Sequence, residues 1–202
     1  MLKTKIAVFV SGGGTNLQAL IDAQVSGIIK SGEIVLVLSS NPSAYALERA
    51  KKAGIKGVTV SRKECADAKE FESRIIAELE KSGAEIIVLA GFMSILSADF
   101  TRRYENRIIN VHPSLIPSFC GKGYYGLAVH EAALKYGVKV TGATVHFVNE
   151  IPDGGKIISQ KAVEIREDDT PETLQKYVME QCEWIILPEA TEKVCKEIAS
   201  NK

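Results

Sequence analysis

The sequence predicts an α/β fold with a mostly parallel, doubly wound sheet, to which the C-terminal part adds antiparallel strands and a long terminal helix. Short apolar runs alternate with segments of helical periodicity through the first half of the 202 residues. Such alternation produces a parallel sheet with helices on both faces. After residue 140, two strand-like runs flank a turn at residues 152–155, which favours antiparallel pairing there.

Five strands and four helices are expected before residue 113. The run at residues 6–10 is continuously apolar, which is typical of a strand buried on both faces, and each expected strand is followed by Ser, Gly or Pro. The expected strands span residues 6–10, 34–38, 57–60, 86–90 and 108–112, and the expected helices span residues 16–23, 44–53, 68–81 and 97–104.

The second half is expected to contain a mobile loop rich in glycine and aromatic residues, a helix and two strands. They span residues 118–126, 127–136, 142–148 and 157–163, in that order. Thr170 and Pro171 then have the residue types of an N-cap and a first helical position. The terminal helix should bury one stripe, and Pro188 should kink or break it. The stripe consists of Leu174, Tyr177, Val178, Cys182 and Ile185.

Length and composition favour a single domain that binds small molecules. A chain of 202 residues with 46% hydrophobic content can bury one sizeable core. Twenty-five basic residues balance 25 acidic ones without a basic cluster, so neither nucleic acid nor a membrane surface is an expected partner. No run approaches the roughly 18 apolar residues of a membrane span. Monomer and homodimer both stay open.

The cysteines and the N-terminus predict a cytoplasmic protein. Cys65, Cys120, Cys182 and Cys195 form no Cys-x-x-Cys pair, so neither a zinc knuckle nor a dithiol redox motif is expected. The first apolar run has five residues, which is too short for a signal peptide.

A glycine-rich segment between the first strand and the first helix is one candidate site. Residues 11–16 read Ser-Gly-Gly-Gly-Thr-Asn. Backbone N–H groups and the positive end of a helix attract phosphate at such a position. The segment lacks a Walker lysine and the Gly-x-Gly-x-x-Gly spacing, so one phosphomonoester is expected rather than a pyrophosphate. The alternative is a structural turn in which Thr15 or Asn16 caps the helix.

Asn110 and His112 form a second candidate site. They lie two residues apart at the end of the fifth expected strand, so both side chains should project from one face. An amide can donate to an oxyanion, and an imidazole, which titrates near pH 6.5, can exchange a proton at neutral pH. Pro113 should hold His112 extended. The alternatives are a turn asparagine and a core histidine.

The remaining histidines and Asp153 carry weaker signals. Asp153 lies in a Pro-Asp-Gly-Gly turn, where an aspartate usually bonds its own backbone. His130 and His146 have no carboxylate at metal-ligand spacing, so His146 is expected to be a packed strand residue and no metal is expected. Residues 92–96 resemble core, but they follow the fourth strand, and the carboxyl ends of parallel strands are where ligands bind.

Four segments together resemble the phosphoribosylglycinamide formyltransferases of purine synthesis. The resemblance extends over residues 6–188 and includes Ser-Gly-Gly-Gly-Thr-Asn-Leu-Gln at 11–18, Leu-Ala-Gly-Phe-Met-Ser-Ile-Leu at 89–96, Asn-Val-His-Pro-Ser-Leu-Ile-Pro at 110–117 and His-Phe-Val-Asn-Glu-Ile-Pro-Asp-Gly-Gly at 146–155. It implies one Rossmann-like formyltransferase domain over residues 1–202. Residues 1–110 would be the phosphate-binding half, and residues 111–202 the catalytic and folate-binding half.

The resemblance also implies the reaction and the residues. A formyl group would pass from 10-formyltetrahydrofolate, a co-substrate, to the amine of phosphoribosylglycinamide without a metal. Asn110, His112 and Asp153 match the family's catalytic trio. The ribonucleotide contacts match Gly12, Gly13, Gly14, Thr15, Asn16 and Glu183, and the folate contacts match Met93, Ser94, Ile95, Leu96 and Asn110.

The implied mechanism is an acyl transfer. The amine attacks the formyl carbon, and the oxyanion accepts hydrogen bonds from Asn110 and a protonated His112, whose charge Asp153 favours. A proton then moves to the folate leaving group through water. The sequence departs from the family pattern at Ser94, where many members carry a basic residue, at Trp184, where many carry His, and at Lys156, where proline is usual. Lys69 is the only candidate for a basic folate contact in residues 67–71.

Three other functions fit parts of the sequence. A formyltetrahydrofolate hydrolase delivers the formyl group to water, but typically carries an N-terminal regulatory domain, for which Ile6 leaves no room. A methionyl-tRNA formyltransferase would need an added C-terminal domain and a basic surface. A noncatalytic nucleotide-binding module would keep the glycine segment but has no need for the trio.

Overall fold

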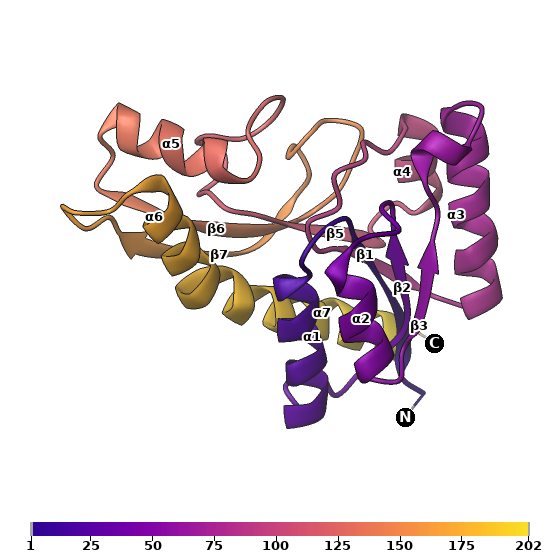
Figure 1. The fold of residues 1–202 in the computed structure, drawn as a ribbon. Helices are drawn as coiled ribbons and strands as arrows, with labels where there is room; N and C mark the ends of the chain where they lie inside the picture. Colours follow the sequence, from indigo (N-terminus) through magenta and orange to yellow (C-terminus); the bar gives the residue numbers. More distant parts are fainter. Residues whose placement is uncertain (1, 202) are drawn as a thin grey trace.

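The predicted sheet is present as one seven-stranded sheet with helices on both faces (Figure 1). The computed structural model describes residues 2–201. The strands are β1 (Thr4–Val10), β2 (Gly32–Ser39), β3 (Lys56–Thr59), β4 (Ile86–Leu89), β5 (Ile108–His112), β6 (Val140–Phe147) and β7 (Ile157–Glu164). The helices are α1 (Thr15–Ser26), α2 (Tyr45–Lys52), α3 (Ala68–Ser82), α4 (Ala98–Arg103), α5 (Leu127–Tyr136), α6 (Pro171–Val178) and α7 (Trp184–Ser200), with a 3-10 turn at Arg62–Glu64 and a π-helical turn at Met179–Glu183.

The strand order is β3-β2-β1-β4-β5-β6-β7. Strands β1 to β5 pair in parallel, whereas β6 is antiparallel to both β5 and β7, as the sequence predicts. The order reverses between β1 and β4, because the chain first builds outward to β3 and then starts again at β4. Ligands of such sheets bind outside the carboxyl ends of the strands at this switch point.

Alternating side chains of β1 explain why helices cover both faces. Ile6 and Val8 belong to a core that α1, α2 and α7 complete, and Ala7 and Phe9 belong to a core that α3 and α4 complete. All four are fully buried, because a strand covered on both faces has no solvent side. Figure 1 shows α1 and α2 on one side of the first strands and α3 on the other.

Most expected elements differ from the observed ones only at their ends. Helix α1 extends to Ser26 rather than ending near residue 23, because the left-handed Gly27 is the residue that ends it. The start of α6 is confirmed. The Thr170 side chain accepts a hydrogen bond from the Thr173 N–H over 3.3 Å, and Pro171 is the first helical residue.

The prediction that Pro188 breaks the terminal helix is wrong. Helix α7 continues through Pro188, and the irregularity is the π-helical turn at Met179–Glu183. A π-helical turn contains more residues than an α-helical turn and therefore rotates everything that follows. As a result Ile185, which the regular stripe places inside, is 38% exposed, whereas Ile186 is buried.

Candidate functional site

Asn110, His112 and Asp153 converge beside the pairing of β5 with β6. Asn110 and His112 lie on the face of β5 opposite Ile109 and Val111, as their two-residue spacing predicts. The turn after β6 brings Asp153 Oδ2 to 3.6 Å from His112 Nδ1. The three residues implied by the family resemblance therefore form one cluster.

Both ring nitrogens of His112 face acceptor oxygens. Nε2 lies 2.9 Å from the Phe119 carbonyl oxygen and must donate to it, while Nδ1 faces the Asp153 carboxylate. A doubly protonated ring satisfies both contacts. His112 is only 4% exposed, so little water competes for these nitrogens.

His146 is buried as expected, but it is also a member of this cluster, which sequence reasoning missed. Its Nδ1 lies 2.8 Å from the Phe147 carbonyl oxygen, to which it must donate, and its Nε2 lies 3.2 Å from Asn110 Nδ2. Nε2 is also 3.6 Å from Asp153 Oδ1. A register shift between Val145 and His146 marks a bulge, a device that re-aims side chains. Asn110 and His146 are a cross-strand pair, but the sequence does not show this pairing, because it depends on the register between β5 and β6.

Asp153 is held by a turn and by a distant loop. Its backbone has φ 55°, in the left-handed region, and Gly155 is required because a Cβ there would collide with the Phe147 carbonyl. Asp153 Oδ2 accepts a hydrogen bond from the Gly121 N–H over 2.8 Å, not from its own turn. Burial raises the pKa of this carboxyl group, but His146, the Gly121 N–H and His112 outweigh burial and lower the pKa. Asp153 is therefore anionic at neutral pH.

The glycine segment, residues 11–14, is held by hydrogen bonds that its carbonyl groups accept from α1 and α2. The Gly12 carbonyl accepts from the Ala46 N–H over 3.1 Å, and the Gly14 carbonyl accepts from the Gln18 N–H over 2.9 Å. Within residues 2–201 the N–H groups of residues 12–14 have no hydrogen-bond partner. The N-cap of α1 is Gly14 without a side-chain cap, so neither Thr15 nor Asn16 has the alternative capping role. Free donors at a helix N-terminus are an arrangement that binds phosphate.

Asn16 and Glu183 meet although 167 positions separate them. Asn16 Nδ2 donates to Glu183 Oε2 over 2.7 Å, and nearby Thr15 Oγ1 lies 3.7 Å from Met179 Sδ. The π-helical turn directs Glu183 inward, where it is 6% exposed. Burial raises the pKa of Glu183 to about 7, although the bond from Asn16 lowers it. Asn16 Oδ1 is buried and, within the described chain, has no partner.

Residues 93–96 lie beside the glycine segment at the switch point. The Met93 N–H donates to Ser11 Oγ over 2.9 Å. Met93 is 59% exposed and Ile95 is 88% exposed, whereas Ser94 and Leu96 are half-buried. No hydrogen bond within residues 2–201 joins this segment to the trio.

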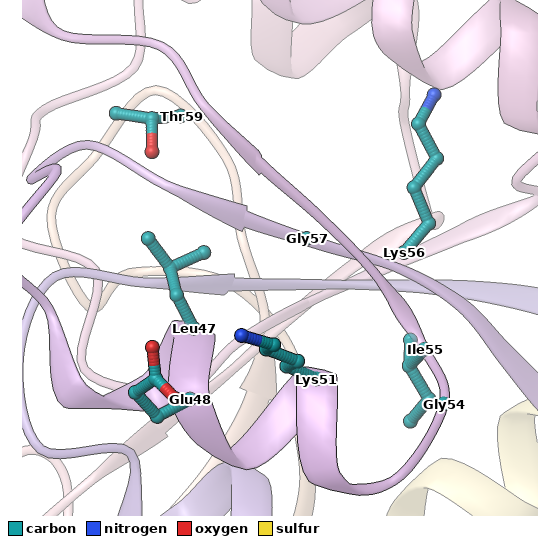
Figure 2. A pocket seen from close by; sticks show the side chains of 8 residues that line it. All are labelled: Leu47, Glu48, Lys51, Gly54, Ile55, Lys56, Gly57 and Thr59. Carbon is teal, nitrogen blue, oxygen red and sulfur yellow. The ribbon is translucent and has the colours of Figure 1, made fainter.

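Two other features are separate from the cluster. A surface groove of about 570 Å³ lies between α2 and β3 (Figure 2) and shares no residue with the trio or the glycine segment. His130 on α5 is fully buried with neither ring nitrogen paired in the described chain, and burial, followed by the nearby His112, lowers its pKa to about 4.

Residues 2–201 contain no group of three His, Cys, Asp or Glu side chains placed to hold a metal. No helix in that range has the length and apolar character needed to cross a membrane.

Comparison with known proteins identifies the family of the chain. Residues 4–191 match the formyl transferase family. The phosphoribosylglycinamide formyltransferase of Haemophilus influenzae is 42% identical over 189 residues, which cover 93% of this chain and 84% of that protein. The chain belongs to the phosphoribosylglycinamide formyltransferase family. The structure of this chain is similar to that of glycinamide ribonucleotide transformylase 1 from Symbiobacterium toebii, with a TM-score of 0.90 and 37% identity, over 96% of this chain and 89% of that one.

Larger proteins are also similar to this chain. The trifunctional purine biosynthetic protein adenosine-3 of Gallus gallus is 44% identical over 178 residues. The match covers 88% of this chain, which spans only 17% of that relative. The family and the fold class predicted from the sequence are confirmed.

Proposed function

We propose that this formyltransferase transfers the formyl group of 10-formyltetrahydrofolate to the amine of phosphoribosylglycinamide in purine biosynthesis. The observation that carries the proposal is the cluster of Asn110, His112 and Asp153, which places two hydrogen-bond donors and an anion together. The printed names of the relatives support the choice of substrate.

Asn110 and His112 supply donors for the formyl oxygen. One Asn110 N–H faces His146 Nε2, and the other has no partner within residues 2–201. His112 Nε2 donates to the Phe119 carbonyl here, and an oxyanion that displaces this carbonyl accepts in the same way. The amine attacks the formyl carbon, the bond from that carbon to the folate nitrogen breaks, and a proton passes from the amine to that nitrogen through water. Anionic Asp153 stabilises the charged ring of His112 throughout.

The ribonucleotide would bind between the glycine segment with α1, near the start of the chain, and the π-helical turn that carries Glu183, near its end. The free N–H groups of Gly12, Gly13 and Gly14 and the first turn of α1 receive its phosphate. Asn16 and Glu183 then face the substrate on the amine side, with Asn16 Oδ1 as a spare acceptor. We infer that residues 1–202 work as one formyltransferase domain, because the bond between these two residues joins its phosphate-binding half to its catalytic half.

The folate would bind against residues 93–96. Met93 and Ile95 expose apolar side chains at the end of β4, where they offer a surface for a flat ring. The bond from the Met93 N–H to Ser11 Oγ holds this surface beside the ribonucleotide site. Ser94 and Leu96 complete the segment, and Asn110 lies on the neighbouring strand.

Incubation of the purified protein with 10-formyltetrahydrofolate, with and without phosphoribosylglycinamide, tests the proposal. We expect tetrahydrofolate to be released only with the acceptor, and the acceptor to become formylated. Release without the acceptor would indicate a hydrolase. Formyl transfer in a parallel incubation with methionyl-tRNA would indicate the tRNA enzyme, and absence of turnover with any acceptor would indicate a noncatalytic module.

The proposal also covers the metal requirement, the partners and the compartment. The steps above need no metal, and small molecules are the proposed partners, whether the protein is a monomer or a homodimer. All four cysteines have free thiols, which fits a reducing compartment such as the cytoplasm. Balanced charge does not favour nucleic acid binding.

A further inference from the structure

Arg49 of α2 contacts the glycine segment from the side of the helix. Its Nε donates to the Gly13 carbonyl over 2.8 Å, and its Nη1 donates to Gln18 Oε1 over 3.0 Å. The guanidinium carbon also lies 5.1 Å from the centroid of the Tyr45 ring. Three contacts therefore fix one half-buried cation beside the segment.

Helix α2 approaches this segment too closely for most side chains. A Cβ on Gly14 would come within 2.6 Å of Ala46 Cβ and 3.4 Å of Arg49 Cδ, and Gly14 has φ 72°. The Ala46 N–H binds the Gly12 carbonyl. The first residues of α2 thus form a support against which the segment is folded.

The direction of the carbonyl groups sets the direction of the N–H groups. In a planar trans peptide the C=O of one residue and the N–H of the next point in opposite directions. Because the Gly13 carbonyl points to Arg49, the Gly14 N–H points away from α2. In the same way, the Gly12 carbonyl points to the Ala46 N–H on α2, so the Gly13 N–H points away from α2. A charged donor on the carbonyl also polarises the peptide and strengthens its N–H as a donor.

We propose that Arg49 is a positioning residue for phosphate binding. It acts through the peptide between Gly13 and Gly14, whose N–H it directs toward the anion, and it adds a positive charge behind that peptide. The proposal rests on the proposed function for the identity of the phosphate-bearing substrate.

Four proteins test this role. Arg49→Met removes the charge and all donors at similar length. Arg49→Lys keeps the charge, but its single nitrogen cannot occupy the positions of both Nε, which binds Gly13, and Nη1, which binds Gln18. Lys51→Met is the matched control, because it removes a charge from the same helix while Lys51 lines the groove toward β3 (Figure 2). Wild type is the reference, and thermal melting confirms that each variant is folded.

The kinetic test compares phosphoribosylglycinamide with the same substrate lacking its phosphate. Arg49→Met should raise the KM for the phosphorylated substrate about tenfold or more, with kcat and the KM for 10-formyltetrahydrofolate within about twofold. Arg49→Lys should raise this KM several-fold, and Lys51→Met should leave it unchanged. For the dephosphorylated substrate, all four proteins should have the same kcat/KM. Equal losses on both substrates, an unchanged KM in Arg49→Met, or wild-type behaviour of Arg49→Lys would overturn the proposal.

A binding test separates this proposal from the proposed function. Calorimetry with ribose 5-phosphate needs no formyl transfer, and Arg49→Met should bind this probe about tenfold more weakly than wild type. Absence of turnover in wild type would reject the proposed function alone. Equal binding of ribose 5-phosphate by wild type and Arg49→Met, or no binding by either, would reject the role of Arg49.

Discussion

Asp153 lies 3.6 Å from Nδ1 of His112, and the other nitrogen of the same ring is bound to the Phe119 carbonyl. The carboxylate therefore serves as a fixed negative charge beside the imidazole. The two residues are 41 positions apart in the chain. Their contact depends on the β5–β6 pairing and on the left-handed turn that carries Asp153.

Asp153→Asn should lower kcat by about 10² or more, because the charged ring of His112 loses its counter-ion. The amide oxygen of the introduced side chain can still accept from the Gly121 N–H, so the turn should persist. The wild-type pKa of Asp153 is lowered, so its charge is present throughout the neutral range. Steady-state kinetics measures kcat, and thermal melting confirms that the variant is folded. A folded variant with turnover near that of wild type would make Asp153 a structural turn residue.

His112→Ala should lower kcat by about 10² or more while the ribonucleotide still binds, because the ring donates to the oxyanion and not to the phosphate. Steady-state kinetics with calorimetry of ribonucleotide binding measures both quantities. Turnover near that of wild type would remove His112 from the mechanism.

Gly13→Val should impair ribonucleotide binding, whereas Gly14→Ala should lower the stability of the protein. A Cβ on Gly13 has no atom within 4 Å, so Gly13→Val should fold normally, raise the ribonucleotide KM strongly and leave folate binding nearly intact. Gly14→Ala puts a Cβ against Ala46 in a left-handed backbone and should lose about 2 kcal/mol or more of unfolding free energy. Thermal melting and KM measurements on both variants separate the effects. Impaired folate binding alone in Gly13→Val would mean that the segment serves the other ligand.

Glu183→Gln should stabilise the ligand-free protein increasingly as the pH rises above 4.5, with the full gain reached above about pH 7. Burial, opposed by Asn16, raises the pKa of Glu183 from 4.5 to about 7. A raised pKa means that the stabilising neutral form is fully present below pH 4.5 and is lost as pH rises through about 7. Glutamine resembles the neutral acid and can still accept from Asn16, so the variant should gain up to roughly 3 kcal/mol above about pH 8, at about 1.4 kcal/mol per pKa unit. Urea unfolding at about pH 5 and about pH 8.5 compares the two, and an equal difference at both values would contradict a titrating Glu183.

The order and type of the elements could be predicted from the sequence because strand and helix periods are local. The run from Ile6 to Val10 is apolar on both faces, and only a strand between two helical layers buries such a run. The shared face of Asn110 and His112 follows from the two-residue repeat of a strand, and the cap at Thr170 follows from hydrogen bonds within four residues. The family resemblance added Asp153 and Glu183, which no local pattern distinguishes from a turn residue and a surface helix residue.

Only the tertiary structure determined the directions and the burial of side chains that depend on contacts between distant segments. A bulge in β6 aims His146 at Asn110, and a strand-register shift leaves no local signal. The π-helical turn at Met179–Glu183 buries Glu183 and exposes Ile185, although a regular 3.6-residue repeat places Ile185 inside. The support that Arg49 gives to Gly13 crosses from α2 to the turn after β1. Each of these contacts arises only after the sheet has brought distant segments together, because side-chain direction at a bulge, a π-helical turn or a packed loop is set by neighbours far away in the chain.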